Sequence, residues 1–312
     1  MLFERSKKTL YIVAGAVFLI AILTVVLKLT GKKGSSGENG IPQFDTASVT
    51  EIKMTPKGGG GEVVFSKKEG GWQLKFPGEK GKTVQAGTQK VENMIYLLSD
   101  PDVKNIVSRN AADRKEYGLD TGYTSVKLFA GDELQLHAYI GKGEMLSQQE
   151  MGSYVRFEGS DDVFLVSGFL DMVFNSDLSL YRDRELGFGG VESWQEVKFS
   201  GDENFSLKRN GSSWLLEGEK PDSVKTEEYL QAFGALQGNE FEDNITLPQG
   251  KKPISQVEVT TVSGRNFTVS AFVVENDTLI ATSMSKGSLF KGGGEGALYS
   301  KVFPGLKNFK SK

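Results

Sequence analysis

The chain has 312 residues and a formal net charge of −3, and it contains no cysteine and a single histidine, His137. This length is enough for two compact domains, and the acidic balance excludes an extended basic surface for nucleic acid. The lack of cysteine excludes disulfides and thiolate metal sites, and one histidine excludes metal motifs that need two. We therefore expect no metal and no cofactor.

A charge-free apolar run extends from Leu10 to Leu27. A helix over residues 9–29 would be about 30 Å long, which matches the hydrocarbon core of a bilayer. No small-residue cleavage site follows the run. We therefore interpret it as a single transmembrane helix rather than as a cleaved signal peptide or a buried core helix.

Basic residues flank both ends of this run, so the positive-inside rule does not separate the two orientations. A short N-terminus before a large domain favours a cytoplasmic location for residues 1–8. The sequence then predicts a single-pass protein of the cytoplasmic (inner) membrane whose bulk is extracytoplasmic or periplasmic. The lipid bilayer is its first expected partner, and the Gly/Ser-rich residues 30–44 are predicted to form a flexible linker.

The next stretch, residues 45–185, is predicted to be a first module. Alternating apolar and polar residues indicate three strands, the last of which contains Trp72. Apolar residues at helical spacing follow Thr88, the predicted N-cap, and extend to Leu98. Four further strands and a short apolar helix complete the module.

Residues 186–305 have the same order of elements, and residues 306–312 form a tail. Trp214 has the place of Trp72, after a Gly/Ser turn and before a helix whose predicted N-cap is Thr226. We interpret the two stretches as tandem copies of one module, and the alternative is a chance likeness between β-meanders. The predicted fold class is α+β: a single N-terminal transmembrane helix followed by two tandem β-rich modules, each a meander, a helix and further antiparallel strands.

Short motifs in a fixed order cover much of the first module and the start of the second. They are residues 117–120 (YGLD) before a strand, residues 154–156 (YVR) in a later strand, and residues 180–186 (LYRDREL). In this order they resemble the DUF4340 domain family of bacterial proteins over residues 45–220. One departure is that Thr121 and Gly122 stand where the family usually has a proline.

This resemblance implies a single-pass envelope protein of a kind that is often encoded near an ABC-type exporter and a gliding-motility-type auxiliary subunit. It implies an accessory role without an ATPase of its own, and the chain has no GxxxxGKS/T phosphate loop. The predicted function is that of a non-catalytic, membrane-anchored accessory subunit, which binds protein or substrate outside the cytoplasm. ABC-type transporter subunits are its expected membrane-protein partners.

Four charged residues between the predicted modules, Arg182, Asp183, Arg184 and Glu185, form the candidate site. Their alternating signs favour docking or inter-module contacts. The alternative is a solvated hinge, whose ion pairs contribute only about 0–1 kcal/mol. His137 lies in an alternating strand, where we expect an exposed side chain. We recognise no catalytic constellation and predict that the protein is not an enzyme.

Two other classes of function stay open. One is an envelope hydrolase that uses paired carboxylates and needs neither histidine nor cysteine. The other is a free-standing scaffold or adhesion protein that binds polymer or other envelope proteins. An enzyme would have acids with shifted pKa values converging in a pocket, whereas a subunit would have an apolar or charge-complementary patch.

Overall fold

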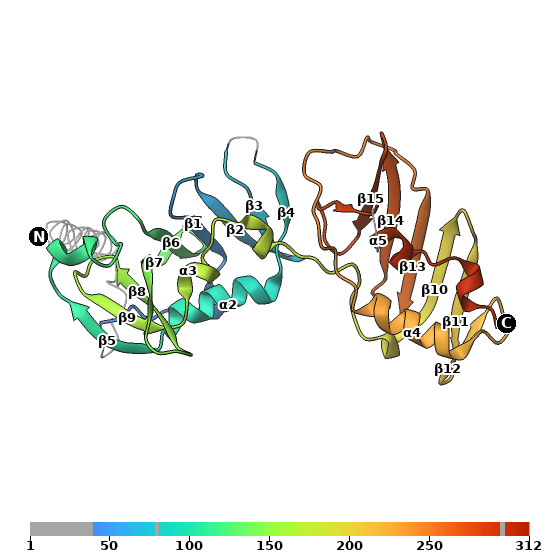
Figure 1. Cartoon of the computed structure of the whole chain (residues 1–312), viewed down its shortest axis with the longest axis horizontal. Helices are drawn as coiled ribbons and strands as arrows, with labels where there is room; N and C mark the ends of the chain where they lie inside the picture. The colour runs from blue at the N-terminus through green and yellow to red at the C-terminus, as the bar shows by residue number, and fades with distance from the viewer. Residues whose placement is uncertain (1–39, 79–80, 294–296, 312) are drawn as a thin grey trace, which may run out of the picture. The chain divides into compact units, whose positions relative to one another are not determined.

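The computed structural model describes residues 40–78, 81–293 and 297–311 (Figure 1). The predicted cytoplasmic residues 1–8, the predicted transmembrane helix 9–29 and most of the predicted linker 30–44 lie outside the described residues. Within the described ranges, no helix combines the length and the apolar character needed to cross a membrane.

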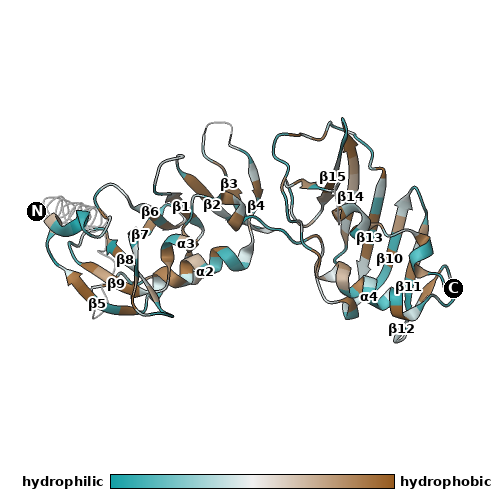
Figure 2. Cartoon of the chain, viewed as in Figure 1, coloured by the Kyte–Doolittle hydropathy of each residue, from teal (hydrophilic) through white to brown (hydrophobic). Residues whose placement is uncertain are grey.

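The first sheet has nine strands in the order β4-β3-β2-β1-β6-β7-β8-β9-β5. Hydrophobic and hydrophilic residues alternate along several of its strands (Figure 2), because successive side chains point to opposite faces of a sheet. Its strands are β1 (Glu51–Thr55), β2 (Val63–Lys68), β3 (Gly71–Lys75), β4 (Thr83–Gln85), β5 (Val103–Ser108), β6 (Thr124–Ala130), β7 (Glu133–Met145), β8 (Met151–Phe157) and β9 (Val163–Ser167).

The second sheet has seven strands in the order β12-β11-β10-β13-β14-β15-β16, and its ladders are antiparallel. At its centre Val197 pairs with Leu207 on one side and with Val259 on the other. Its strands are β10 (Trp194–Gly201), β11 (Phe205–Asn210), β12 (Ser213–Leu216), β13 (Ser255–Thr261), β14 (Phe267–Val274), β15 (Asp277–Thr282) and β16 (Phe290–Lys291).

Helices account for a small part of the described chain. The α-helices are α2 (Thr88–Ser99), α3 (Leu170–Val173), α4 (Ser223–Gly234) and α5 (Leu298–Val302). Short 3-10 turns are η1 (Thr46–Ser48), η2 (Ala111–Lys115), η3 (Leu178–Tyr181), η4 (Val191–Ser193) and η5 (Leu306–Phe309).

The strand orders of the two sheets correspond. The series β3-β2-β1-β6-β7-β8-β9 in the first sheet has the same sequence order as β12-β11-β10-β13-β14-β15-β16 in the second. A twelve-residue helix follows β4 in one case and β12 in the other. Trp72 and Trp214 are each the second residue of their strand, and both are buried.

The predicted fold class was wrong. The described residues form mostly antiparallel sheets with few helices, so that α+β overstates the helical part, and they contain no helix that could cross a membrane. The physical reason is that strand-like alternation occupies more of the described residues than helical spacing does. Among the described residues, alternation with period two occurs in many segments, whereas only α2 and α4 reach the length of three helical turns.

The chain divides into two compact units. Of the described residues, one unit contains those up to Ile52 together with Ile95–Val173, and the other contains those of Lys53–Met94 together with those from Phe174 onward. The predicted module boundaries, 45–185 and 186–305, stay predictions.

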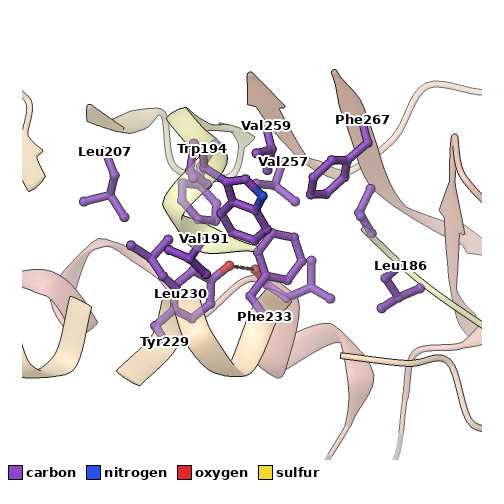
Figure 3. Close-up of a cluster of buried hydrophobic side chains, with 14 of the residues drawn as sticks. Leu186, Val191, Trp194, Leu207, Tyr229, Leu230, Phe233, Val257, Val259 and Phe267 are labelled. Atoms are coloured by element: carbon purple, nitrogen blue, oxygen red, sulfur yellow. Dashed lines mark hydrogen bonds between the residues drawn. The ribbon is translucent and has the colours of Figure 1, made fainter. Parts of the chain in front are cut away.

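The core of the second unit lies between α4 and the seven-stranded sheet (Figure 3). Trp194 has ring centroid distances of 5.7 Å to Phe233 on α4 and 5.6 Å to Phe267 on β14. The buried hydroxyl of Tyr229 donates to the carbonyl of Val302 at 2.7 Å. Aromatic side chains therefore make a large part of the core between helix and sheet, and the buried phenol of Tyr229 is paired.

The start of α4 differs from the prediction. The sequence predicted Thr226 as its N-cap, but the helix begins at Ser223 and its N-cap is Asp222, whose side chain accepts a hydrogen bond from the Lys225 amide at 3.2 Å. Thr226 therefore lies inside the helix, where it is 1% exposed and its hydroxyl has no hydrogen-bond partner among the described residues. Aspartate and threonine can both cap a helix. Asp222 is the cap because it faces the first free amides of α4, whereas Thr226 does not.

We expect Thr226→Val to raise the free energy of unfolding by about 1 kcal/mol, because it replaces an unpaired buried hydroxyl with a methyl group of similar volume. Thr226→Ser is the matched control: it keeps the hydroxyl, removes the methyl group and should lower stability by about 1 kcal/mol. Urea unfolding of the three proteins checks this. A valine variant that is less stable than the parent would contradict the assignment.

Candidate functional site

The segment 181–186 (YRDREL) pairs with two other backbone segments of its compact unit. Arg182 forms an antiparallel bridge to Ala86, and Glu185 forms one to Gln237. Backbone pairing of this kind fixes the direction in which successive side chains leave the segment. The four candidate residues consequently divide between the interior and the surface.

The side chain of Arg182 lies in the interior and is only 1% exposed. Its Nη1 donates to both carboxylate oxygens of Asp243, at 2.9 and 2.8 Å, and its Nη2 donates to the hydroxyl of Ser288 at 3.1 Å. The guanidinium carbon lies 3.5 Å from the ring centroid of Phe241. A buried guanidinium needs such compensation, and Arg182 receives it as a charge pair, a hydrogen bond and a cation–π contact.

The ion pair extends to a second cation, because Lys82 Nζ lies 3.0 Å from Asp243 Oδ1. Burial lowers the pKa of Arg182, and the charge of Asp243 acts in the opposite direction. Burial alone would raise the pKa of Asp243, but the hydrogen bond from Lys82 and the charge of Arg182 bring it below its ordinary value. The carboxylate of Asp243 is therefore ionised at neutral pH.

The other three candidate residues have different surroundings. Burial raises the pKa of Asp183, whose side chain accepts a hydrogen bond from the Glu185 amide at 2.9 Å. Burial likewise raises the pKa of Glu185, and the neighbouring charge of Asp183 adds to this. Arg184 donates to the carbonyl of Asn239 at 3.0 Å and is partly exposed.

An open cleft of about 410 Å³ lies beside this segment. Arg182 and Arg184 both line it, whereas Asp183 and Glu185 do not. The cleft is also lined by the aromatic rings of Phe76 and Phe241 and by the carboxylates of Asp177, Glu240 and Asp243. The lining residues are Phe76, Asp177, Leu178, Ser179, Arg182, Arg184, Asn239, Glu240, Phe241 and Asp243.

Sequence reasoning missed the partners of Arg182. Asp243 is 61 residues away and Ser288 is 106 residues away, and Phe241 lies in the stretch between α4 and β13 that has few secondary-structure elements. The residues that follow Arg182 are charged, so the local sequence contained no signal of its burial. The assignment of the four residues to docking or inter-module contacts stays a prediction.

His137 lies in the first unit and is less exposed than the sequence led us to expect. Its side chain is 13% exposed, and its Nε2 lies 2.9 Å from the hydroxyl of Ser125. Its Nδ1 lies 3.5 Å from a carboxylate oxygen of Glu158, which also accepts a hydrogen bond from Tyr139. Burial lowers the pKa of His137, and the charge of Lys127 lowers it further, so the ring is neutral at pH 7.

Among the residues that the structure describes, no cluster of three or more His, Asp or Glu side chains is arranged to hold a metal ion. The protein thus consists mostly of antiparallel β-sheet in two compact units. One unit has the mixed-charge cleft at Arg182 and Arg184, and the other has the polar cluster around His137 on a sheet.

The model of the family described as a domain of unknown function (DUF4340) matches residues 79–254. This is more than half of the chain, which therefore belongs to the DUF4340 family. The match includes Arg182, Asp243 and Lys82. No curated protein and no solved structure matches the chain.

We expect Arg182→Ala to lower the free energy of unfolding by about 3 kcal/mol. This is the lower end of the range for buried pairs, because the Asp243 side chain is 45% exposed and water screens it. Arg184→Ala is the matched control and should cost less than about 1 kcal/mol. Urea unfolding measures both, and equal effects of the two substitutions would contradict the burial of Arg182.

The lowered pKa of Asp243 also predicts a pH dependence. A carboxylate with a depressed pKa in the folded state contributes stability above its unfolded pKa of about 3.9, and this contribution is lost as the pH falls through the folded value. The stability difference between the parent and Asp243→Asn should therefore be constant from pH 7 to about pH 5 and shrink below about pH 4. Urea unfolding at a series of pH values checks this, and a difference that grew on acidification would contradict it.

Proposed function

We propose that this DUF4340 protein is a non-catalytic accessory subunit of an ABC-type export complex, which acts outside the cytoplasm by binding a protein partner or substrate. The cleft beside residues 181–186 is the proposed binding surface. The observation that carries this proposal is that its two arginines differ: one is bonded inside the protein and the other keeps hydrogen-bond donors for a partner.

Arg182 is engaged inside the protein by Asp243, Ser288 and Phe241. The guanidinium of Arg184, in contrast, makes one hydrogen bond within the described part of the chain, from Nη1 to the backbone carbonyl of Asn239, although it has five donor N–H groups. Its free donors, together with the carboxylates of Asp177 and Glu240, give the cleft charges of both signs over aromatic rings. Such a combination suits a protein–protein interface, in which arginine and aromatic side chains are enriched.

The proposed location rests on the sequence. The apolar run from Leu10 to Leu27, with basic residues on both sides, supports attachment to the cytoplasmic membrane. Attachment would raise the effective concentration of the cleft at a membrane partner without any additional contact.

We expect Arg184→Glu to reduce recovery of transporter subunits by about tenfold, or 1.4 kcal/mol, when the tagged protein is crosslinked in native membranes and purified. Reversal of a charge that faces a partner puts like charges together. Lys198→Glu is the matched control, because Lys198 is exposed on β10 of the same unit. Circular dichroism should show that both variants are folded.

Three outcomes of this purification separate the alternatives. Loss of transporter subunits with Arg184→Glu alone supports the accessory role. Equal recovery from all three proteins would contradict the cleft as the docking surface. Recovery of envelope polymer in place of transporter subunits would favour the free-standing scaffold or adhesion protein.

An envelope hydrolase is the second candidate, because Ser125, His137 and Glu158 follow one another at 2.9 and 3.5 Å. The order of a hydroxyl, an imidazole and a carboxylate is that of a nucleophile, a base and an orienting group. Two features weaken this interpretation: 3.5 Å is longer than an ordinary N–H···O bond, and Tyr139 already donates to the same oxygen of Glu158.

A fluorophosphonate probe distinguishes the two candidates, because it labels serines that an adjacent base activates. We expect no labelling of Ser125 above that of Ser125→Ala, as judged by mass spectrometry of the tryptic peptides. We also expect His137→Ala to leave partner recovery intact. Labelling of Ser125 that disappears in His137→Ala would favour the hydrolase.

A further inference from the structure

A second hollow of the same unit lies where β10 and β11 meet the C-terminal segment. Its volume is about 250 Å³, which is smaller than a typical pocket for a drug-sized ligand. Aromatic and acidic residues dominate its lining. The lining residues are Phe199, Ser200, Asp202, Glu203, Phe205, Ser255, Tyr299, Phe303, Pro304 and Gly305.

Four aromatic rings contribute to this hollow, in two pairs. Phe199 and Phe205 are stacked, with ring centroids 4.4 Å apart and planes inclined by 17°. Tyr299 and Phe303 lie one helical turn apart, and their centroids are separated by 5.1 Å. The hydroxyl of Tyr299 is hydrogen-bonded to that of Ser255 at 2.8 Å, which fixes the orientation of its ring.

Two carboxylates complete the lining. Glu203 accepts a hydrogen bond from the Leu306 amide through Oε2 at 2.6 Å, and a carboxylate has further lone pairs for another partner. Gly305 permits this approach: its φ is +79°, and a Cβ at this position would lie 3.0 Å from Glu203 Oε2. Asp202 is the second acid, and no lysine or arginine of the described chain lines the hollow.

We propose that this hollow binds a quaternary ammonium group. The faces of aromatic rings carry negative electrostatic potential, and a cage of several rings is the usual protein site for such cations. Asp202 and Glu203 add two negative charges that no cation of the lining neutralises. A trimethylammonium group is weakly hydrated, so it gives up less hydration than a primary ammonium when it enters an aromatic site.

The same unit contains a comparable site that a cation of the chain itself already occupies. The guanidinium of Arg182 lies against Phe241 and pairs with Asp243, so that an aromatic ring and a carboxylate hold a cation of the chain itself. The hollow at Phe303 and Glu203 offers the same two kinds of group to a cation from outside. This site is separate in residues from the cleft at Arg184, and its occupation does not depend on the proposed accessory role.

Choline titrated into the full-length protein in detergent, followed by isothermal calorimetry and by aromatic proton chemical shifts, tests the proposal. We expect saturable binding, and no saturation with 3,3-dimethylbutan-1-ol, which is the neutral isostere of choline. Glu203→Gln keeps the acceptor for the Leu306 amide and removes the charge, and we expect it to weaken choline binding at least fivefold. Phe303→Leu keeps apolar volume without the ring and should weaken binding similarly.

Glu228→Gln is the matched control, because Glu228 is exposed on α4, and it should bind choline like the parent. Arg184→Glu should do so as well, which separates failure of this site from failure of the docking cleft. Equal binding of choline and its neutral isostere, or unchanged binding in Glu203→Gln, would overturn the proposal. Tighter binding of N-acetyl-lysinamide than of choline would overturn the assignment to a quaternary ammonium.

Discussion

The buried guanidinium of Arg182 imposes conditions on much of its compact unit. A cation that is 1% exposed must be neutralised and hydrogen-bonded, and the groups that do so come from two separate stretches of chain. Asp243 and Phe241 lie in the long connection before β13, and Ser288 lies before β16. Lys82 pairs with Asp243 as a second cation. The backbone of residues 181–186 and the surrounding connections therefore have to be ordered together.

The two surfaces that we propose for binding follow from how charges are satisfied. At the cleft, one arginine is engaged internally and its neighbour Arg184 is left with donors to spare, so recognition there would use polar and charged contacts. At the hollow near Phe303, acids and rings occur together without a basic residue in the lining, so the complementary ligand is a cation. Neither site requires a nucleophile or a base.

The polar cluster around His137 illustrates why contact geometry has to be weighed before chemistry is assigned. Ser125, His137 and Glu158 are close enough to suggest catalysis. However, each partner is also explained by neighbouring strands of an antiparallel sheet, where cross-strand side chains commonly meet. Tyr139 takes part in the same network and shares the carboxylate of Glu158, and Arg156 lies 4.0 Å from the Tyr139 ring. This arrangement is consistent with a stabilising face of the sheet.

Local patterns in the sequence determined the features that depend on neighbours along the chain. Alternation located most strands, helical spacing located α2 and α4, and the order of short motifs identified the DUF4340 family. The predicted α+β class was wrong, because local propensity does not say how much of a chain each type of element takes. The predicted N-cap of α4 was also wrong, because propensity does not say which of two capping residues faces the free amides. The partners of Arg182 and the rings and acids around Phe303 were decided by the tertiary structure alone, because residues up to about a hundred positions apart meet only when the sheets and their connections pack.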